Sequence, residues 1–275
     1  MSPKSRFPGE NLPDKKLGPV VSTLSAAGPD GSAILHGSLV TLEPWSVSNH
    51  WTSFWRNLQL LENPWLMDYF SFDEVYSEED MLKQVAHAAA EPDVILYAVL
   101  ADPACLAPTK GTGGMESSVR HIEVLGFMAY SLAGAMHREI EIGALFAPAL
   151  QRTAAATEAH HTMLMNVLEP TDVQGGSSLP YRRVSWKCNS LNTSSRRAAE
   201  RLGYVYEGTL RNHQIIKGRS RDTSWFSIID TEWPSIKSAL QKWLVGSNFD
   251  NHGMQVKALG HIRAELLSMV GCSDE

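Results

Sequence analysis

The segment 139–159 combines acidic side chains with a strand-to-helix junction that could bind an anion. Its first part alternates apolar and polar residues, with Glu141 on the polar face, which predicts a strand over 139–146. Pro148 ends that strand, and a helix is predicted from about 151 to 168. The unpaired N–H groups of a helix's first turn, together with the helix dipole, attract anions such as phosphate. Ala154–156 at this turn would let a bulky phosphate approach the backbone.

The segment 181–208 contains a second strand-to-helix unit with a polar junction. Alternation over 182–189 predicts a strand, with Val184 and Trp186 on one face. Asn192 is a good N-cap for a helix that runs to about 202. Gly203 then occupies the position where a glycine commonly ends a helix, and another strand follows.

The first of these segments resembles the acyl-CoA pyrophosphate loop of the GNAT superfamily of N-acetyltransferases. The usual pattern there is Gln/Arg-x-x-Gly-x-Gly/Ala, and this chain has Gln151, Ala154 and Ala156 at the three fixed positions. Alanine replaces the usual central glycine. Because alanine resists the positive φ that glycine permits, we expect this loop to stay near helical geometry.

The second segment resembles the other conserved block of that superfamily, Asn-x-x-Ser-x-x-x-x-x-x-x-Gly-Phe/Tyr. The matching residues are Asn192, Ser195, Gly203 and Tyr204. Ala-Thr-Glu-Ala at 156–159 and the pattern over 207–229 further resemble the RimJ/RimL branch, which modifies protein N-termini. The resemblance covers roughly residues 36–233. Two ordered blocks at the right separation are far more specific than either block alone.

The resemblance implies a mixed α/β (α+β) fold, with a mostly antiparallel, twisted sheet flanked by helices. Two central parallel strands, at about 139–146 and 182–189, would splay apart and leave backbone groups free for the amides of pantetheine. We ascribe the gap to Ala147-Pro148, because proline cannot donate a hydrogen bond to a strand ladder.

The resemblance also implies an acyl-CoA-dependent N-acyltransferase that moves an acetyl group from acetyl-CoA to a primary amine by direct attack. Backbone N–H groups of the first block would hold the pyrophosphate and polarise the thioester carbonyl. The expected cofactor-binding residues are Leu150, Gln151, Arg152, Thr153, Ala154, Ala155, Ala156, Asn192 and Ser195. No metal is expected.

Glu141 is the predicted general base, because the family often places a carboxylate on this strand to take the amine proton. The alternative is an ordinary strand residue at the surface. Many relatives carry a tyrosine that protonates the leaving thiolate, but Ala199 stands at that position here. Tyr204, Ser195 or a water could serve instead, or the thiolate could leave without direct protonation.

The acceptor is left open by these residues. It is either a protein N-terminus or a small-molecule amine or biosynthetic intermediate. Two readings from other functional classes also remain: a CoA-binding sensor or scaffold without catalysis, and a protein of this fold without a CoA site. The acyl chain length and the oligomeric state are not indicated.

We divide the chain into a loosely structured N-terminal arm (1–35), an acyltransferase domain (36–233) and a C-terminal helical extension (234–275). A hairpin insertion at 102–120 and a loop at 169–180 interrupt the domain. Further elements are expected at 37–42, 45–58, 78–90, 94–101 and 123–132.

The composition is that of an ordinary globular enzyme. The 275 residues are 43% hydrophobic and 20% charged, with a net charge of −6. The acidic balance predicts no general attraction to nucleic acid or to an anionic membrane. Three widely spaced cysteines, no signal peptide and no apolar run of membrane-spanning length favour a cytoplasmic location.

Several other side chains have structural explanations that compete with functional ones. Trp45, Trp51, Trp55 and Trp65 are expected to pack in the core or to line an acceptor pocket. His160 and His161 are adjacent on a helix, so their side chains diverge, and we expect one to be buried and one to be solvated. Arg196 and Arg197 form a basic pair that is either solvated or close to the CoA phosphates.

Overall fold

The computed structural model describes residues 18–26, 28–107, 121–169 and 179–271. Within them, eight strands form one sheet, and helices cover both of its faces. The strands are β1 (Leu35–His36), β2 (Val40–Pro44), β3 (Val94–Ala101), β4 (Glu123–Ser131), β5 (Glu139–Phe146), β6 (Arg183–Asn189), β7 (Val205–Ile216) and β8 (Arg219–Ile229). The helices are α1 (Val47–Leu58), α2 (Glu78–Ala90), α3 (Ala154–Leu168), α4 (Thr193–Leu202), α5 (Trp233–Leu244) and α6 (Leu259–Gly271).

The sheet has the strand order β1-β2-β3-β4-β5-β6-β8-β7. All neighbouring pairs are antiparallel except β5 and β6, which run parallel. This confirms the predicted mixed fold with two parallel central strands. The parallel pair is the consequence of α3, which carries the chain back along the sheet between the two strands.

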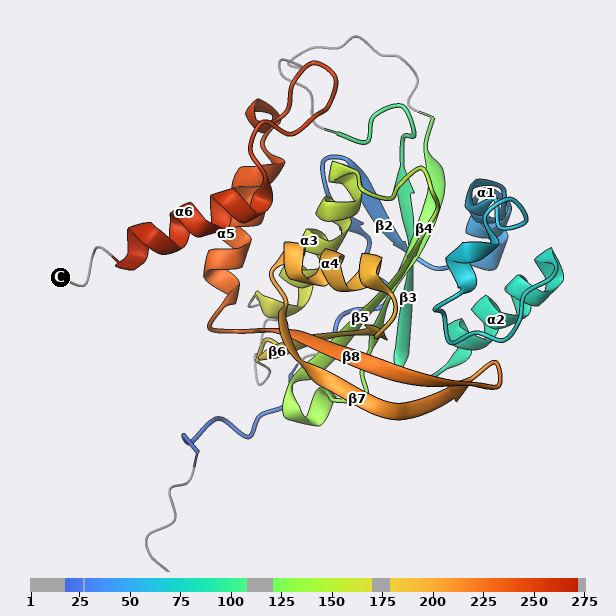
Figure 1. Ribbon diagram of the computed structural model, residues 1–275, viewed down its shortest axis with the longest axis horizontal. Helices are drawn as coiled ribbons and strands as arrows, with labels where there is room; N and C mark the ends of the chain where they lie inside the picture. Colours follow the sequence, from blue (N-terminus) through green and yellow to red (C-terminus); the bar gives the residue numbers. More distant parts are fainter. Residues whose placement is uncertain (1–17, 27, 108–120, 170–178, 272–275) are drawn as a thin grey trace, which may run out of the picture.

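Two apolar clusters hold the helices on opposite faces of the sheet (Figure 1). α3, α4 and α5 cover one face, where Ile140 and Ile142 of β5 are buried beneath α3. α1 and α2 cover the other face, where Phe54 and Met81 pack against Phe127 of β4. The predicted alternation of β5 is therefore confirmed, and its acidic residues point to the α1/α2 face.

The N-cap signals in the sequence correspond to the observed helix starts. The Ser77 hydroxyl caps α2 by accepting a hydrogen bond from the backbone of Asp80. The Asn192 side chain caps α4 in the same way, and Gly203 ends that helix with a φ of 112°. Left-handed backbone of this kind is accessible to glycine at little cost.

α5 and α6 pack onto the rest of the molecule rather than extending away from it. Trp233, Ile236 and Leu240 of α5 are buried in the same cluster as α3. The boundary expected between 233 and 234 therefore falls within the first turn of α5. At the other end of the chain, the described residues of 18–26 and 28–34 contain no helix and only an isolated bridge, from Ala26 to Leu179. The hairpin expected at 102–120 lies largely outside the described residues, as does most of the loop at 169–180.

The β7–β8 hairpin reaches the segment between α1 and α2. Its turn contains Lys217 and Gly218, which both have positive φ. The ammonium of Lys217 donates a hydrogen bond of 2.8 Å to the carbonyl of Met67, in the short helix η1 (Pro64–Met67). Figure 1 shows the tip of the hairpin approaching α2. The hairpin and the α1–α2 segment are thus joined on the face that carries the acidic residues of β5.

Candidate functional site

The central parallel pair opens into a gap along most of its length. β5 and β6 pair only over Glu139–Glu141 and Arg183–Ser185. β5 continues to Phe146 and stays paired with β4 over this stretch, but beyond Glu141 its other edge has no strand partner among the described residues. Unpaired backbone N–H and C=O groups on such an edge can bind an extended ligand as a strand would. The gap opens at Ile142, well before Pro148, so proline does not explain where the strands separate.

Glu141 lies at the vertex of this gap, because it is the last residue of β5 that pairs with β6. Its Oε2 atom lies 2.8 Å from the ammonium of Lys187 on β6, and 20% of its side chain is exposed. Burial raises the pKa of Glu141, and the positive charge of Lys187 opposes this shift. A largely desolvated carboxylate with a raised pKa is a better proton acceptor than a free one.

A second ionic cluster braces the narrow end of the gap, on the same face of the sheet. The guanidinium of Arg183 donates to Glu139 at 3.0 Å and to both carboxylate oxygens of Glu207 at 2.5 Å. The hydroxyl of Ser227 donates to Glu207 at 2.6 Å. These contacts join β5, β6, β7 and β8, and they leave the charge of Arg183 fully paired. The cluster therefore holds the strands together where the ladder ends.

The helix that was expected to begin near Gln151, beside the predicted anion site, begins three residues later in the structure. The helix begins at Ala154, and Thr153 is its N-cap, with Oγ1 accepting from the Ala156 N–H at 3.1 Å. Arg152 takes the left-handed conformation (φ 63°) that the alanines avoid. The expectation of helical geometry therefore applies to Ala154 and Ala156 but not to the turn before them.

The junction offers fewer free donors than the sequence implied. The N–H of Ala155 donates to the carbonyl of Leu106 at 3.0 Å, and that of Gln151 donates to Ala147. The side chain of Gln151 donates to the carbonyl of Phe146 at 2.9 Å. Within the described part of the chain, the N–H of Ala154 has no hydrogen-bond partner.

Side chains at this junction divide into core and surface. Leu150, Ala154 and Ala155 are buried, so they position the backbone rather than contact a ligand directly. Arg152 is exposed and Ala156 is partly exposed. An anion at this helix start would therefore meet the backbone and the guanidinium of Arg152.

The start of α4 lies beside β6, and its polar side chains are already engaged. The side-chain oxygen Oδ1 of Asn192 accepts a hydrogen bond from the backbone N–H of Ser195 at 3.0 Å. The Ser195 hydroxyl accepts from the indole of Trp186 at 3.0 Å. Trp186 in turn stacks on His160 of α3, with ring centroids 5.1 Å apart. Trp186 of β6 thus connects to α4 through Ser195 and to α3 through His160, and Asn192 caps α4.

The structure does not bring Tyr204 together with Glu141. Tyr204 is 3% exposed and lies in the core on the α3 face, the face opposite to Glu141. Its hydroxyl is buried with no hydrogen-bond partner among the described residues, and burial raises its pKa. A hydroxyl in that location is remote from an amine on the α1/α2 face, so Tyr204 has no role in the reaction proposed below.

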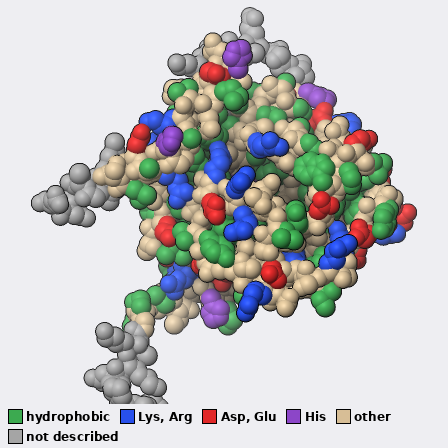
Figure 2. All heavy atoms as spheres, viewed as in Figure 1, with side chains coloured by type: hydrophobic (Ala, Val, Ile, Leu, Met, Phe, Trp, Pro, Cys, Tyr) green, Lys and Arg blue, Asp and Glu red, His purple; other side chains and the backbone are tan. Residues whose placement is uncertain are grey.

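Basic side chains gather near the helix starts. Figure 2 shows Lys and Arg side chains on the face of the molecule where α4 lies. Arg197 of α4 is exposed, and the guanidinium of Arg196 lies 5.8 Å from the ring centroid of Tyr206. Neither residue, nor Arg152, forms an ion pair within the described ranges. These cations remain available to an anionic ligand.

The tryptophans of the first helical region mostly pack. Trp51 is buried and donates through its indole to Glu78 at 2.8 Å, and it stacks on Trp55. Trp65 is 50% exposed. A cavity of about 320 Å³ beside them is lined by Trp55, Leu60, Leu61, Pro64, Met67, Asp68, Glu74, Val75, Tyr76, Ser77 and Lys217. Only Trp55 of the four tryptophans lines it.

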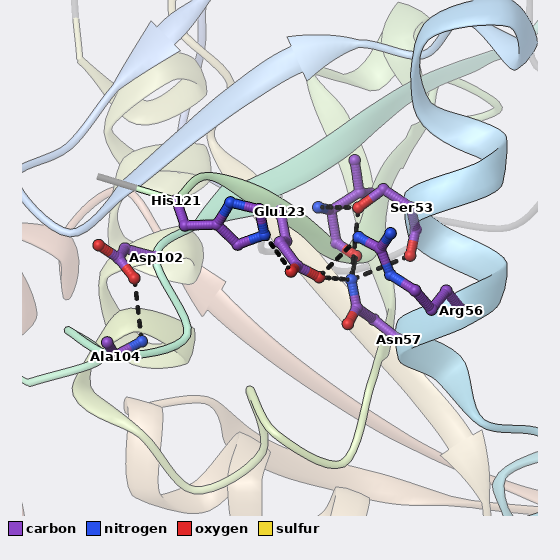
Figure 3. Close-up of polar contacts among 8 residues, drawn as sticks. Ser53, Arg56, Asn57, Asp102, Ala104, His121 and Glu123 are labelled. Atoms are coloured by element: carbon purple, nitrogen blue, oxygen red, sulfur yellow. Dashed lines mark hydrogen bonds and ion pairs between the residues drawn. The ribbon is translucent and has the colours of Figure 1, made fainter. Parts of the chain in front are cut away.

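A polar cluster fixes α1 to the start of β4 (Figure 3). The carboxylate of Glu123 accepts from Asn57, and it pairs with Arg56 at 3.1 Å and with His121 at 2.7 Å. The hydrogen bond from Asn57 is the main cause of the lowered pKa of Glu123. Ser53 accepts from the Val124 backbone at 2.9 Å. Each of these groups has a hydrogen-bond or ion-pair partner within the cluster, so we assign the cluster a structural role.

Both histidines of α3 are buried, which corrects the expectation that one would be solvated. His160 is 4% exposed and His161 is 9% exposed. α3 is covered by the sheet on one side and by α5 on the other, so adjacent positions can both be buried. Within the described residues, no group of three or more His, Cys, Asp or Glu side chains could hold a metal ion. No helix there is long and apolar enough to cross a membrane.

Sequence reasoning missed Lys187 of β6, which pairs with Glu141, and Arg221 and Trp225 of β8, which lie on the same face of the sheet. The alternation of Arg221, Thr223 and Trp225 was the available signal, since residues two apart share a face of a strand.

Comparison with known proteins agrees with this geometry. The family model described as "Acetyltransferase (GNAT) domain" matches residues 40–205. No curated protein matches the sequence significantly. A GCN5-related N-acetyltransferase from Brucella melitensis shares 30% identity, over 88% of this chain and 98% of that one, with a TM-score of 0.72. A probable GNAT-family acetyltransferase from Chromobacterium violaceum shares 31% identity, over 81% of this chain and 99% of that one, with a TM-score of 0.64.

A more distant structure carries a ligand. Mycobacterium smegmatis RimJ, in complex with CoA-disulfide, shares 18% identity over 74% of this chain and 88% of that one, with a TM-score of 0.53. That likeness concerns the fold alone.

Proposed function

This chain belongs to the GNAT family of acetyltransferases, and we propose that it transfers an acetyl group from acetyl-CoA to a primary amine. The family uses acyl-CoA as the donor. In this chain, the proposal requires residues that can bind such a donor and a residue that can accept the proton of the amine.

One observation carries the proposal: a carboxylate stands at the vertex of the β5–β6 gap, and the start of helix α3 lies beyond its open end. From Glu141 to Phe146 the edge of β5 is about 17 Å long at the usual rise of a strand. α3 begins shortly after that strand ends. An acyl-CoA has the matching order of parts, with phosphates at one end, an amide-bearing arm and a thioester at the other end.

The residues present fit such a donor. The free edge of β5 offers backbone groups to the amides of the arm, and the α3 start with Arg152 suits the pyrophosphate. The cations Arg196 and Arg197 on the neighbouring helix α4 suit a further phosphate. Asn192 is assigned to the arm through its amide, beyond its role as a cap.

The reaction needs a neutral amine close to the thioester carbonyl. The amine nitrogen attacks the carbonyl carbon, so a C–N bond forms, and the C–S bond then breaks to release the CoA thiolate. Glu141 takes the proton that the amine loses, either directly or through a water. Lys187 holds Oε2 of Glu141, which leaves Oε1 for the proton. The thiolate takes a proton from solvent, because a thiol is acidic enough to leave without a dedicated acid.

The test is the Glu141→Gln variant, assayed by thiol release from acetyl-CoA with a panel of amines and by the mass of the product. We expect kcat to fall by roughly a hundredfold to ten-thousandfold, which is the usual contribution of a general base. The stabilisation by acetyl-CoA should persist, since a ligand at 100 times its Kd raises stability by about 2.7 kcal/mol.

Glu139→Gln is the matched control, because Glu139 lies on the same face of β5 but is held by Arg183 within the paired region. We expect it to change kcat by less than about threefold. If Glu141→Gln lowers kcat by less than threefold at saturating substrates and neutral pH, another residue is the base. Equal losses in both variants would point to the charge of the strand rather than to Glu141.

A wild-type protein that binds acetyl-CoA but modifies no amine would instead be a CoA-binding sensor or scaffold. If acetyl-CoA does not raise the melting temperature at all, the chain has no donor site.

A further inference from the structure

A buried arginine near Glu141 has no partner within the described chain. The side chain of Arg221 on β8 belongs to a residue that is only 8% exposed, and its Nε–H is buried without a hydrogen-bond acceptor. It takes part in no hydrogen bond or ion pair among the described residues. An unpaired charge of this kind is costly to bury, so a partner that completes it is expected.

A second unpaired donor lies on the same face of β8. Arg221 and Trp225 are four residues apart on one strand, so both point to the face that carries Glu141. The Nε1–H of Trp225 is also buried and lacks a hydrogen-bond acceptor within the described ranges. Trp225 stands directly opposite Lys187, whose ammonium lies 5.7 Å from the centre of the indole ring.

These donors lie on the same face of the sheet as the predicted base. Lys187 forms the ion pair with Glu141 at 2.8 Å, and the charge of Arg221 also favours the ionised form of Glu141. Arg183 on this face is paired with Glu139 and Glu207, and Lys187 is paired with Glu141, so among the described residues Arg221 is the cation of this group without a carboxylate partner. In a site of low dielectric, this unpaired cation and the two unused N–H groups select an anionic, oxygen-bearing group.

We propose that the acceptor is an amino acid or related amino carboxylic acid, whose carboxylate is bound by the Nε–H of Arg221 and the Nε1–H of Trp225. This inference rests on the proposed acetyl transfer and names its acceptor class. The amine must lie near Glu141 to lose its proton. Trp225 lies beside the Lys187 that pairs with Glu141, and Arg221 lies on the same face of β8. A carboxylate a few bonds from the amine can therefore reach from Glu141 toward these donors.

The test compares three acceptors that share one amine: an amino acid, its primary amide and the amine that lacks the carboxyl group. For wild type we expect kcat/KM to favour the acid at least tenfold over both others. In Arg221→Gln the preference should fall to below threefold, through a higher KM for the acid. Trp225→Phe, which keeps an aromatic ring but removes the indole N–H, should lower the preference by a smaller factor.

Arg219→Gln is the matched control, because Arg219 is an exposed arginine on the same strand. It should leave the preference unchanged. Circular dichroism and melting temperature establish that each variant is folded. Trp225→Phe keeps the test decisive if Arg221→Gln does not fold.

Binding is measured separately, by the effect of the amino acid and of its amide on the melting temperature in the presence of CoA. If no amine is acetylated, selective stabilisation by the acid still supports the carboxylate site, while the proposed function fails. Equal kcat/KM for the three acceptors, with no selective stabilisation, would overturn the inference and leave acetyl transfer intact. Equal losses of kcat for all three in Arg221→Gln would also overturn it, because Arg221 would then stabilise charge on the reacting thioester.

Discussion

The buried carboxylate of Glu158 provides the sharpest test of how α3 is held in place. Glu158 is 8% exposed and lies in the second turn of α3. Its two oxygens accept three backbone N–H groups from the turn before β2: those of Ser38 at 3.0 Å, Leu39 at 2.6 Å and Val40 at 3.1 Å. One side chain therefore connects the helix that begins at the predicted anion site to the first strands of the sheet.

The Glu158→Gln variant keeps the size of this side chain and removes half of its acceptors. An amide has one oxygen, and its NH₂ group cannot accept, so at least one of the three N–H groups loses its partner. Losing a hydrogen bond to a charged group costs about 1.5–3 kcal/mol, and leaving a buried donor unsatisfied costs about 1–3 kcal/mol. We therefore expect the free energy of unfolding to fall by about 3–5 kcal/mol. At roughly 2–4 °C per kcal/mol, this lowers the Tm by about 10 °C.

The assay is urea unfolding followed by circular dichroism, together with a thermal melt. Glu200→Gln is the control, since Glu200 is an exposed carboxylate on α4 and should change stability by less than about 0.5 kcal/mol. Gly37→Ala tests the same contact from the other side, because a Cβ on Gly37 would lie 2.7 Å from the carboxyl carbon of Glu158. A fall in Tm of less than about 2 °C in Glu158→Gln would refute the reasoning, because the three bonds would then contribute nothing beyond what an amide supplies.

Three further predictions follow from the site and from α3. Arg152→Glu should weaken acetyl-CoA binding by about tenfold to a hundredfold, because it reverses the charge at the α3 start, whereas Arg152→Gly, which suits the φ of 63°, should weaken it less. Calorimetry measures both affinities, and affinities equal to that of the wild type would remove Arg152 from the site. Asn192→Ser should keep the Tm, because serine also caps a helix, yet raise the KM for acetyl-CoA; an unchanged KM would make Asn192 a cap only. Burial lowers the pKa of His160 to about 4, so between that value and about 6.5 the unfolded chain binds more protons and stability falls as the pH falls. The loss attributable to His160 should reach about 2 kcal/mol at pH 5, and pH-dependent urea melts of His160→Phe should lack it; the same pH dependence in that variant would assign it to other groups.

The parts of the fold that were predictable from the sequence are those with local causes. Alternation over 139–146 requires only that every second side chain meets an apolar layer, and β5 has those bounds. The caps at Ser77 and Asn192 are likewise bonds between residues three apart. The order of strand, helix and strand then made β5 and β6 parallel, because a chain that returns through a helix re-enters the sheet in the same direction.

The position of the gap had a cause that no local pattern contains. Pro148 suggested a break at the end of β5, but the ladder already ends at Glu141. What keeps the strands together up to that point is the cluster of Arg183 with Glu139 and Glu207, and Glu207 comes from β7. A contact between residues 24 positions apart on separate strands depends on the register of the whole sheet.

Tyr204 shows the same limit for a single side chain. Its place after Gly203 correctly indicated the end of α4 and the approach to β7. Which face of the sheet it meets depends on how α4 packs, and the structure directs it into the core with Trp186. Arg221 was overlooked for the converse reason. An arginine in a strand normally lies at the surface, and its burial follows only from the neighbours that the fold brings to it.

The bond between the Ala155 N–H and the Leu106 carbonyl has a consequence for donor binding that sequence reasoning could not reach. A helix start attracts anions through its unpaired N–H groups, and here one of them already has a partner from a segment nearly 50 residues earlier in the chain. A pyrophosphate that needs the Ala155 N–H must therefore displace Leu106. One that uses the Ala154 N–H and the Arg152 side chain leaves that bond intact. The strength of the anion site thus depends on the chain that follows β3 as much as on the α3 sequence itself.

Replacing the small residues of the helix start is a poor probe of this site, because Ala154 and Ala155 are buried and a charged substitute would perturb the core before it reached a phosphate. Arg152, exposed and adjacent to the helix start, separates the two effects.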